Sequence, residues 1–300
     1  MKIITSVRKM QAWADQRRRE GRCIALVPTM GALHAGHEAL VRAALSSADD
    51  VVVSIFVNPT QFGPREDLND YPRSFDKDVE ILDRLSSGLT VFAPGIEEMY
   101  PEGVQADRIS VDVGDMNRYL CGPFRQGHFE GVATIVLKLF HACRPHVAVF
   151  GLKDAQQFVI LSRLVREMLL DISVVGVPTV RAADGLAFSS RNVYLSPVQR
   201  KAAVVVSQAV FGAEEAIGKG EQHRAALVEI MRSILRRETD AQVQYADVVD
   251  ADTLQPIDEI SPGQHVLAAV AVCFGSTRLI DSVFTQAPAG QRVEKYDEGS

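Results

Sequence analysis

The chain has 300 residues, of which 47% are hydrophobic and 23% are charged, and its formal net charge at pH 7 is −6. This composition is ordinary for a globular protein, and the length predicts roughly two domains. The negative charge argues against a nucleic-acid partner, which would need a basic face. The longest uninterrupted apolar run, residues 266–274, is too short to span a bilayer, so we expect no membrane partner.

The cysteines indicate a reducing compartment. Cys23, Cys121, Cys143 and Cys273 are scattered along the chain and form no C-x-x-C pair. A pattern of this kind is typical of a cytoplasmic protein without a structural zinc site. We therefore expect a cytoplasmic chain whose side chains hold no metal.

Apolar runs alternate with helical patterns through the first half of the chain. We predict strands at residues 23–27, 51–57, 147–150 and 172–177, and helices at residues 36–46, 74–85, 131–143 and 154–169. This alternation predicts an α/β domain over residues 1–182, a doubly wound parallel sheet of the Rossmann-like kind. Ligands of such sheets bind beyond the carboxyl ends of the strands.

The pattern changes after residue 182. Ser196 and Pro197 open a helix that we expect to run to about residue 217, followed by a second helix at residues 223–237. Strand-like runs follow at residues 243–249, 266–273 and 277–284. We therefore expect a smaller α+β domain over residues 183–286, closing over the site, and a disordered tail at residues 287–300.

The segment PTMGALHAGH, residues 28–37, directly follows the first long apolar run. An apolar run, a glycine-bearing turn and then a helix form the layout of a phosphate site at a helix N-terminus, where free backbone N–H groups favour an anion. Two imidazoles there, His34 and His37, suggest chemistry on a nucleotide. The pair could instead bind a metal or be structural.

Three further polar segments follow apolar runs or lie at the domain junction. FVNPTQFG carries Asn58 and Gln61, whose amides could bind a small polar substrate, although an ordinary turn also explains it. GLKDAQQ offers Lys153 to a phosphate, Asp154 as a helix cap and Gln157 to the cleft. FSSRN, with Arg191, suits phosphate oxygens or serves as a polar linker.

Together these segments resemble the pantoate–beta-alanine ligase family over residues 1–285. The matching segments, in that family's order, are PTMGALHAGH, FVNPTQFG, YPRS at residues 71–74, GHFEGVAT at residues 127–134, KDAQQ and SSRN. The H-x-G-H motif of residues 34–37 also resembles that of nucleotidylyltransferases and class I aminoacyl-tRNA synthetases.

The resemblance implies a two-step ligation. ATP and pantoate would give pantoyl adenylate and pyrophosphate, and the amine of beta-alanine would then attack the acyl carbon to give pantothenate and AMP. It implies His37, His34, Lys153 and Arg191 as catalytic residues, with Mg²⁺ on the phosphates of ATP. We further expect a homodimer.

The resemblance also assigns the binding residues. Pantoate and beta-alanine would be bound by Gln61, Gln157 and Asn58. The ATP site would be lined by Met30, Gly31, Ala32, Leu33, His34, Ala35, Gly36, His37, Gly151, Leu152, Lys153, Asp154, Val180, Phe188, Ser189, Ser190 and Arg191.

The sequence departs from the family's pattern at Leu152, Phe188 and Glu38, where glutamate, methionine and leucine respectively are common. None of these changes removes a group on which the mechanism depends, although Leu152 and Phe188 flank the ATP segments. Three alternatives stay open: a zinc hydrolase that uses His34 and His37, another adenylyl transferase on the same fold, and a nucleotide-binding module without catalysis.

Overall fold

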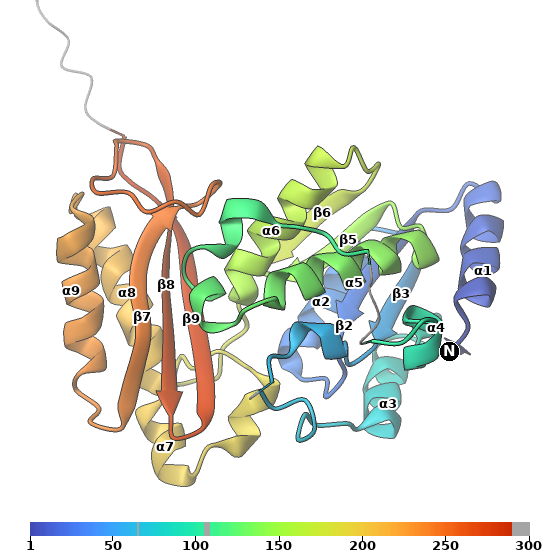
Figure 1. The fold of residues 1–300 in the computed structure, drawn as a ribbon, viewed down its shortest axis with the longest axis horizontal. Helices are drawn as coiled ribbons and strands as arrows, with labels where there is room; N and C mark the ends of the chain where they lie inside the picture. Colours follow the sequence, from blue (N-terminus) through green and yellow to red (C-terminus); the bar gives the residue numbers. More distant parts are fainter. Residues whose placement is uncertain (65, 105–108, 290–300) are drawn as a thin grey trace, which may run out of the picture.

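The computed structural model describes residues 1–64, 66–104 and 109–289. Its main sheet has the parallel strand order β1-β4-β3-β2-β5-β6 (Figure 1). The strands are β1 (Lys2–Ile4), β2 (Ile24–Thr29), β3 (Asp50–Ile55), β4 (Thr90–Phe92), β5 (Val147–Gly151) and β6 (Ser173–Val177). The chain moves outward from β2 to β4 and then returns to the other side of β2, so the order of strands reverses between β2 and β5.

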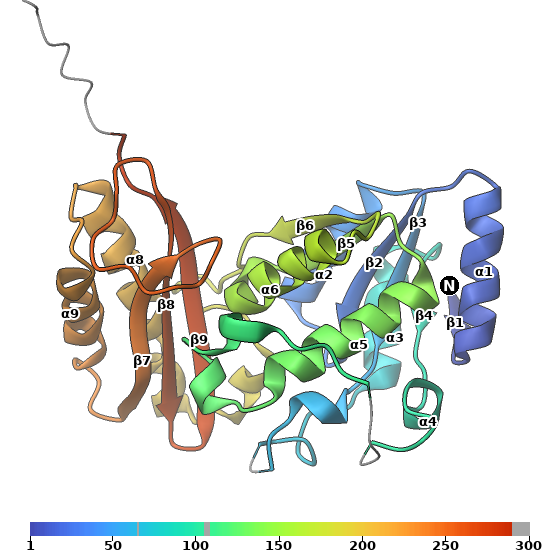
Figure 2. The same ribbon diagram turned by 45° about the horizontal axis from the view of Figure 1, so that its top comes forward.

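Helices cover both faces of this sheet because alternate strand residues are apolar on both sides. On one face, Leu26, Val52 and Phe150 pack with α1 (Val7–Arg19), α5 (His128–Cys143) and α6 (Ala155–Glu167). Figure 2 shows α5 and α6 crossing the near face of the sheet. On the other face, Val27 and Val53 pack with α2 (Ala35–Leu45) and α3 (Phe75–Leu85). A short helix, α4 (Ile96–Met99), follows β4.

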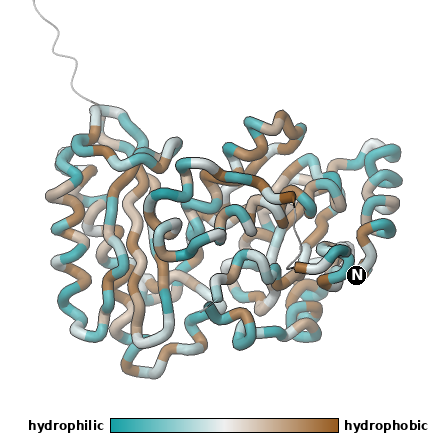
Figure 3. Tube along the Cα trace, in the orientation of Figure 1, coloured by the Kyte–Doolittle hydropathy of each residue, from teal (hydrophilic) through white to brown (hydrophobic). Residues whose placement is uncertain are grey.

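The C-terminal part is built on an antiparallel sheet of β7 (Ala241–Asp250), β8 (His265–Phe274) and β9 (Thr277–Gln286). Helices α8 (Val204–Gly218) and α9 (Arg224–Leu235) cover one face, and the other face packs on the start of α6 through residues such as Leu267 and Val159. In Figure 3, hydrophilic and hydrophobic residues alternate around α1 and α9, each of which buries one side only.

The predicted fold class, a Rossmann-like parallel sheet followed by a smaller α+β part, is confirmed. The division at residues 182 and 183 stays a prediction, and residues 290–300 of the predicted tail lie outside the described residues. In the part of the chain that the structure describes, no helix has the length and apolarity that a membrane span requires.

The predicted long helix from Ser196 is wrong in one respect, because the structure divides it into α7 (Pro197–Ala202) and α8 with a turn at Ala203. The side chain of Ser196 caps α7 through the Gln199 backbone, and Gln199 returns the bond in a capping box. Helix α8 then begins with valines, of which Val205 and Val206 are buried against the antiparallel sheet. The division falls where the chain passes from the largely exposed α7 to the buried first turns of α8.

Candidate active site

Helix α2 begins at the carboxyl end of β2, as the sequence predicts, and its two histidines cap it reciprocally. The backbone N–H of Gly36 donates to Nδ1 of His34 at 3.1 Å, and the N–H of His34 donates to Nδ1 of His37 at 3.3 Å. The first contact needs glycine at 36, because a Cβ there would lie 2.9 Å from Cε1 of the His34 ring. The imidazoles thus take the place of the usual Ser or Asp cap.

This arrangement fixes the protonation of both rings. A ring nitrogen that accepts a hydrogen bond carries no proton, so in the neutral imidazole the proton lies on Nε2. Burial lowers the pKa of His34 to about 4, with help from the Lys153 cation, and burial lowers the pKa of His37 to about 3. Near neutral pH the site therefore holds two neutral rings whose Nε2–H groups are free of backbone bonds. Both rings line one cavity at the carboxyl edge of the parallel sheet, and their centroids are 4.1 Å apart.

The carboxyl end of β3 leads into η1 (Pro59–Gln61), which positions the amide of Gln61. The buried Asn58 donates from Nδ2 to Oε1 of Gln61 at 3.1 Å and to the Gly131 carbonyl at 3.2 Å, while its Oδ1 accepts from the Tyr100 hydroxyl at 2.6 Å. Nε2 of Gln61 then points to the sulfur of Met30 at 3.0 Å, a weak acceptor. Gln61 can offer this N–H to a ligand, whereas the Asn58 amide is already occupied.

Two residues of the α5 region hold η1 in place. Gly131 allows the helix to come close, since a Cβ there would lie 2.5 Å from the Thr60 carbonyl oxygen. His128 donates from Nδ1 to the carbonyl of Gln61 at 2.8 Å and accepts from Arg125 through Nε2 at 2.8 Å. This assignment fits a neutral ring, and burial together with the Arg125 cation lowers the pKa of His128 to about 3.

At the carboxyl end of β5, the turn η4 (Leu152–Asp154) precedes α6. The ammonium of Lys153 lies 3.7 Å from Oδ1 of Asp154, and both residues line the cavity together with Gln157. The predicted capping role of Asp154 is wrong, because its carboxylate accepts no hydrogen bond from the N-terminus of α6. Its carboxylate instead faces the Lys153 cation. The amide of Gln157 has no hydrogen-bond partner within the described residues.

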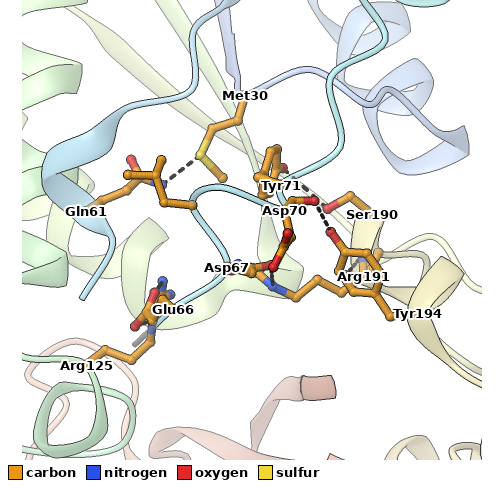
Figure 4. Close-up of polar contacts among 12 residues, drawn as sticks. Met30, Gln61, Glu66, Asp67, Asp70, Tyr71, Arg125, Ser190, Arg191 and Tyr194 are labelled. Carbon is orange, nitrogen blue, oxygen red and sulfur yellow. Dashed lines mark hydrogen bonds and ion pairs between the residues drawn. The ribbon is translucent and has the colours of Figure 1, made fainter. Parts of the chain in front are cut away.

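The junction segment with η5 (Ser190–Tyr194) packs against the loop that precedes α3 (Figure 4). Arg191 makes two hydrogen bonds to Asp67, the Tyr71 hydroxyl lies 3.3 Å from Oγ of Ser190, and the Tyr194 hydroxyl donates to the Asp70 carbonyl at 2.9 Å. Figure 4 also shows Arg125 facing Glu66, a pair joined at 2.9 and 2.6 Å.

One cavity at the carboxyl edge of the parallel sheet brings most of the predicted residues together. Of the predicted ATP and catalytic residues, it is lined by Met30, His34, Gly36, His37, Gly151, Lys153, Asp154, Val180, Phe188, Ser189, Ser190 and Arg191. It is also lined by the three predicted substrate residues Asn58, Gln61 and Gln157. Gly31, Ala32, Leu33, Ala35 and Leu152 do not line this cavity, and a role for them in ATP binding stays a prediction.

Sequence reasoning assigned no role to several residues at the site. Tyr71, Arg125 and His128 line the cavity, and all but Arg125 lie inside family segments that could have singled them out. Apolar residues cover the end of the cavity near α5, among them Phe56, Val132, Ile135, Val136, Leu139 and Phe150. Phe56 and Val132 belong to family segments, whereas the positions of the others depend on the packing of α5 on the sheet, which a local motif does not predict.

A zinc site would need a third ligand near His34 and His37. Within the described residues no three His, Cys, Asp or Glu side chains are grouped so that they could hold a metal ion.

The sheet order and the histidine-capped helix at its reversal point are those of a Rossmann-like enzyme. The model of the pantoate-beta-alanine ligase family matches residues 2–284, almost the whole chain. The chain belongs to this family, and it is therefore a ligase.

Several relatives match over their full length. The chain is 58% identical over 295 residues to a pantothenate synthetase of Salinibacter ruber, covering 97% of this chain and 100% of the relative. It is 45% identical to that of Acetivibrio thermocellus, covering 95% and 100% respectively.

Solved structures agree with the fold. The crystal structure of pantothenate synthetase from Thermus thermophilus superimposes with a TM-score of 0.86 at 42% identity, covering 94% of this chain and 99% of that one. A pantoate-beta-alanine ligase from Francisella tularensis, complexed with beta-gamma ATP and beta-alanine, gives a TM-score of 0.76 at 29% identity, covering 94% and 97%.

Proposed function

We propose that the chain ligates pantoate and beta-alanine to pantothenate in the cavity described above, through a pantoyl adenylate, with release of pyrophosphate and AMP. The observation that carries this proposal is that one cavity is lined both by donors suited to phosphate oxygens and by amides suited to a hydroxy acid. The Nε2–H groups of His34 and His37 and the Lys153 ammonium can serve phosphate oxygens, and the amides of Gln61 and Gln157 can serve a hydroxy acid.

In the first step the carboxylate of pantoate attacks the α-phosphorus of ATP, and pyrophosphate leaves. A carboxylate needs no base, so the protein contributes alignment and stabilisation of charge on the phosphoryl oxygens. His34 and His37 donate as neutral rings at the N-terminus of α2, where the helix dipole also favours an anion. Lys153 adds a full positive charge, and Arg191 can add a second if it turns from Asp67.

In the second step the amine of beta-alanine attacks the acyl carbon of the adenylate, and AMP leaves. The same donors hold the departing phosphate, while Gln61 and Gln157 keep the pantoyl hydroxyls in place. The apolar end of the cavity, near Val136 and Leu139, suits the methyl groups of pantoate and excludes water that would hydrolyse the adenylate.

Mg²⁺ belongs to the proposal as the companion of ATP. Asp154 carries the carboxylate that lines the cavity among the described residues, and its side chain is 51% exposed, which fits a cation shared with substrate phosphates. Bound there, the ion would neutralise part of the phosphate charge. A homodimer and a cytoplasmic location complete the proposal, and sedimentation analysis tests the first.

The test is ATP–pyrophosphate exchange. Purified protein with Mg²⁺ and ATP should exchange labelled pyrophosphate when pantoate is present and beta-alanine is absent. A panel of hydroxy acids serves as the control, and only acids close to pantoate should support exchange. Exchange that requires beta-alanine contradicts the adenylate route, and exchange with another acid but not with pantoate indicates a different adenylyl transferase.

A further inference from the structure

The turn between β2 and α2 is held by a carboxylate from a distant helix. Asp78, in the first turn of α3, accepts from the Ala32 N–H through Oδ2 at 2.9 Å and from the Leu33 N–H through Oδ1 at 2.8 Å. Asp78 is 1% exposed, and the Ser74 hydroxyl adds a bond to Oδ1 at 3.3 Å. A buried anion therefore bridges two successive backbone amides 45 residues or more away.

The turn needs this support because of its backbone. Gly31 has φ +82° and Ala32 has φ +50°, so two successive residues lie in the left-handed region, which Ala enters at a cost. Successive N–H groups in such a turn converge, and an anion between them stabilises the conformation. The fit is close, since a Cβ at Gly31 would lie 2.9 Å from Oδ2 of Asp78.

We propose that Asp78 is a positioning residue for ATP: it fixes the 31–33 turn and so sets where His34 enters α2. Leu33 is followed directly by His34, whose backbone N–H and ring form the helix cap. Any shift of the turn moves both imidazoles, because His34 directly follows Leu33 and its backbone N–H holds the His37 ring. Neither Asp78 nor residues 31–33 line the cavity, so we infer that the carboxylate acts through the turn.

This inference rests on the proposed placement of the ATP phosphates at the start of α2. It makes a prediction that a general packing role would not make. A residue needed only for folding lowers the amount of active protein and affects all substrates alike. A residue that positions His34 affects the ATP step while the amides of Gln61 and Gln157, held by other elements, still bind pantoate.

The experiment compares Asp78→Asn with Asp76→Asn. The amide introduced by Asp78→Asn keeps one acceptor oxygen and loses the other, which weakens the grip on the turn. Asp76 lies on the same first turn with an exposed side chain and serves as the matched control for charge and helix dipole. In D78N we expect the KM for ATP to rise and kcat to fall by about 10- to 100-fold, the loss that a misplacement of about 1 Å causes. The KM for pantoate should stay within about twofold of wild type, and D76N should behave as wild type.

A second variant and a second readout guard against misfolding. Gly31→Ala keeps the Asp78 carboxylate but places a methyl group against its Oδ2. This variant should give the same ATP-selective defect. Hydrogen exchange of the Ala32 and Leu33 amides should be slow in ligand-free wild type and faster in D78N.

An equal rise of the KM values for ATP and pantoate in folded D78N overturns the inference. Wild-type kinetics in both D78N and Gly31→Ala also overturn it. So does rapid exchange of the two amides in the wild type. Failure of the proposed function gives a different result: wild-type protein would then lack pantoate-dependent exchange of pyrophosphate, whatever the exchange rates of the Ala32 and Leu33 amides.

Discussion

The guanidinium of Arg191 lies against the carboxylate of Asp67 in a two-bond pair, with Nε 2.9 Å from Oδ2 and Nη2 2.8 Å from Oδ1. Asp67 belongs to the loop before α3, and Arg191 belongs to the junction that leads to the C-terminal part. The guanidinium also lies over the Tyr71 ring, 5.8 Å from its centroid. The junction is thus docked on the first part of the chain, and the cation that we propose for the triphosphate has an anionic partner within the protein.

The first prediction concerns this pair. Arg191→Lys keeps the charge and loses the planar fork, so it should lower ATP-dependent activity, and Arg191→Ala should lower it further. The measurement is kcat/KM for ATP, with hydrogen exchange near residue 191 followed at saturating ATP. Arg200→Ala is the control, because Arg200 makes a similar two-bond pair with Asp184 outside the cavity. Full activity of both Arg191 variants, with no protection by ATP, would leave the segment as a polar linker.

The second prediction concerns the histidines. His34→Ala and His37→Ala should each lose about 10²- to 10³-fold in kcat, the range for one preorganised donor. They should also lose the helix cap, at about 0.5–2 kcal/mol. His34→Asn separates the two effects, because its side chain can cap α2 without the ring Nε2–H. Thermal melting should show near wild-type stability for this variant, whereas its activity should stay low. Recovery of activity along with stability would mean that His34 is structural.

The third prediction uses two neighbouring glutamines. Gln157→Ala and Gln61→Ala should weaken pantoate binding much more than ATP binding, because each removes an amide that can bond the substrate. Gln157→Ala breaks no hydrogen bond within the described residues, whereas Gln61→Ala also removes one acceptor of the Asn58 amide. Gln156→Ala should behave differently, since its buried amide bonds Cys121, Met116 and Tyr119 within the protein. It should lower the melting temperature without substrate selectivity. Titration of each variant with pantoate and with ATP measures the two affinities. An equal loss of affinity for both ligands in Q157A contradicts the assignment.

The fourth prediction is a dependence of stability on acid. The pKa values of His37 and His128 are lowered to about 3 in the folded chain, against about 6.5 when unfolded. The unfolded state therefore binds protons first as pH falls, so the stability is fully present above about pH 6.5 and declines below it. Urea unfolding at about pH 7 and about pH 5 measures this decline. It should be smaller in His128→Gln, and an unchanged decline in that variant would contradict the prediction.

The sequence was sufficient for the segments that carry chemistry. Residues 28–37, 58–61 and 151–157 each follow an apolar run, and strands of a parallel sheet end at one edge, so their meeting could be foreseen. The short strands β1 and β4 could not be, because three residues give no measurable period. The turn at Ala203 was missed for a different reason, since valines that are buried by tertiary packing still fit a helical pattern.

The supporting residues of the site were beyond the reach of motifs. Asp78 looks like one more acidic residue on an amphipathic helix, and only the approach of α3 to the β2–α2 turn gives it two backbone partners. Asn58 shows the opposite case. Its place in a family segment predicts contact with substrate, which stays a prediction, and the contacts that the structure adds are those of its amide with Tyr100, Gln61 and Gly131. In both cases the side chain contacts residues that are distant in the sequence, which a local motif does not predict.

The close approach of α5 to η1 at Gly131 restricts which substitutions the protein can accept at this position. A residue with any side chain at 131 would press on backbone at Thr60 and Gln61, where no rotamer change can relieve it. Any substitution of Gly131 should therefore displace Gln61, whose amide we propose binds pantoate. In a random mutagenesis screen, position 131 should appear as a site of lost pantoate use although it offers no side chain to any ligand. Evolution of a wider substrate range would have to begin elsewhere, on the apolar wall of α5.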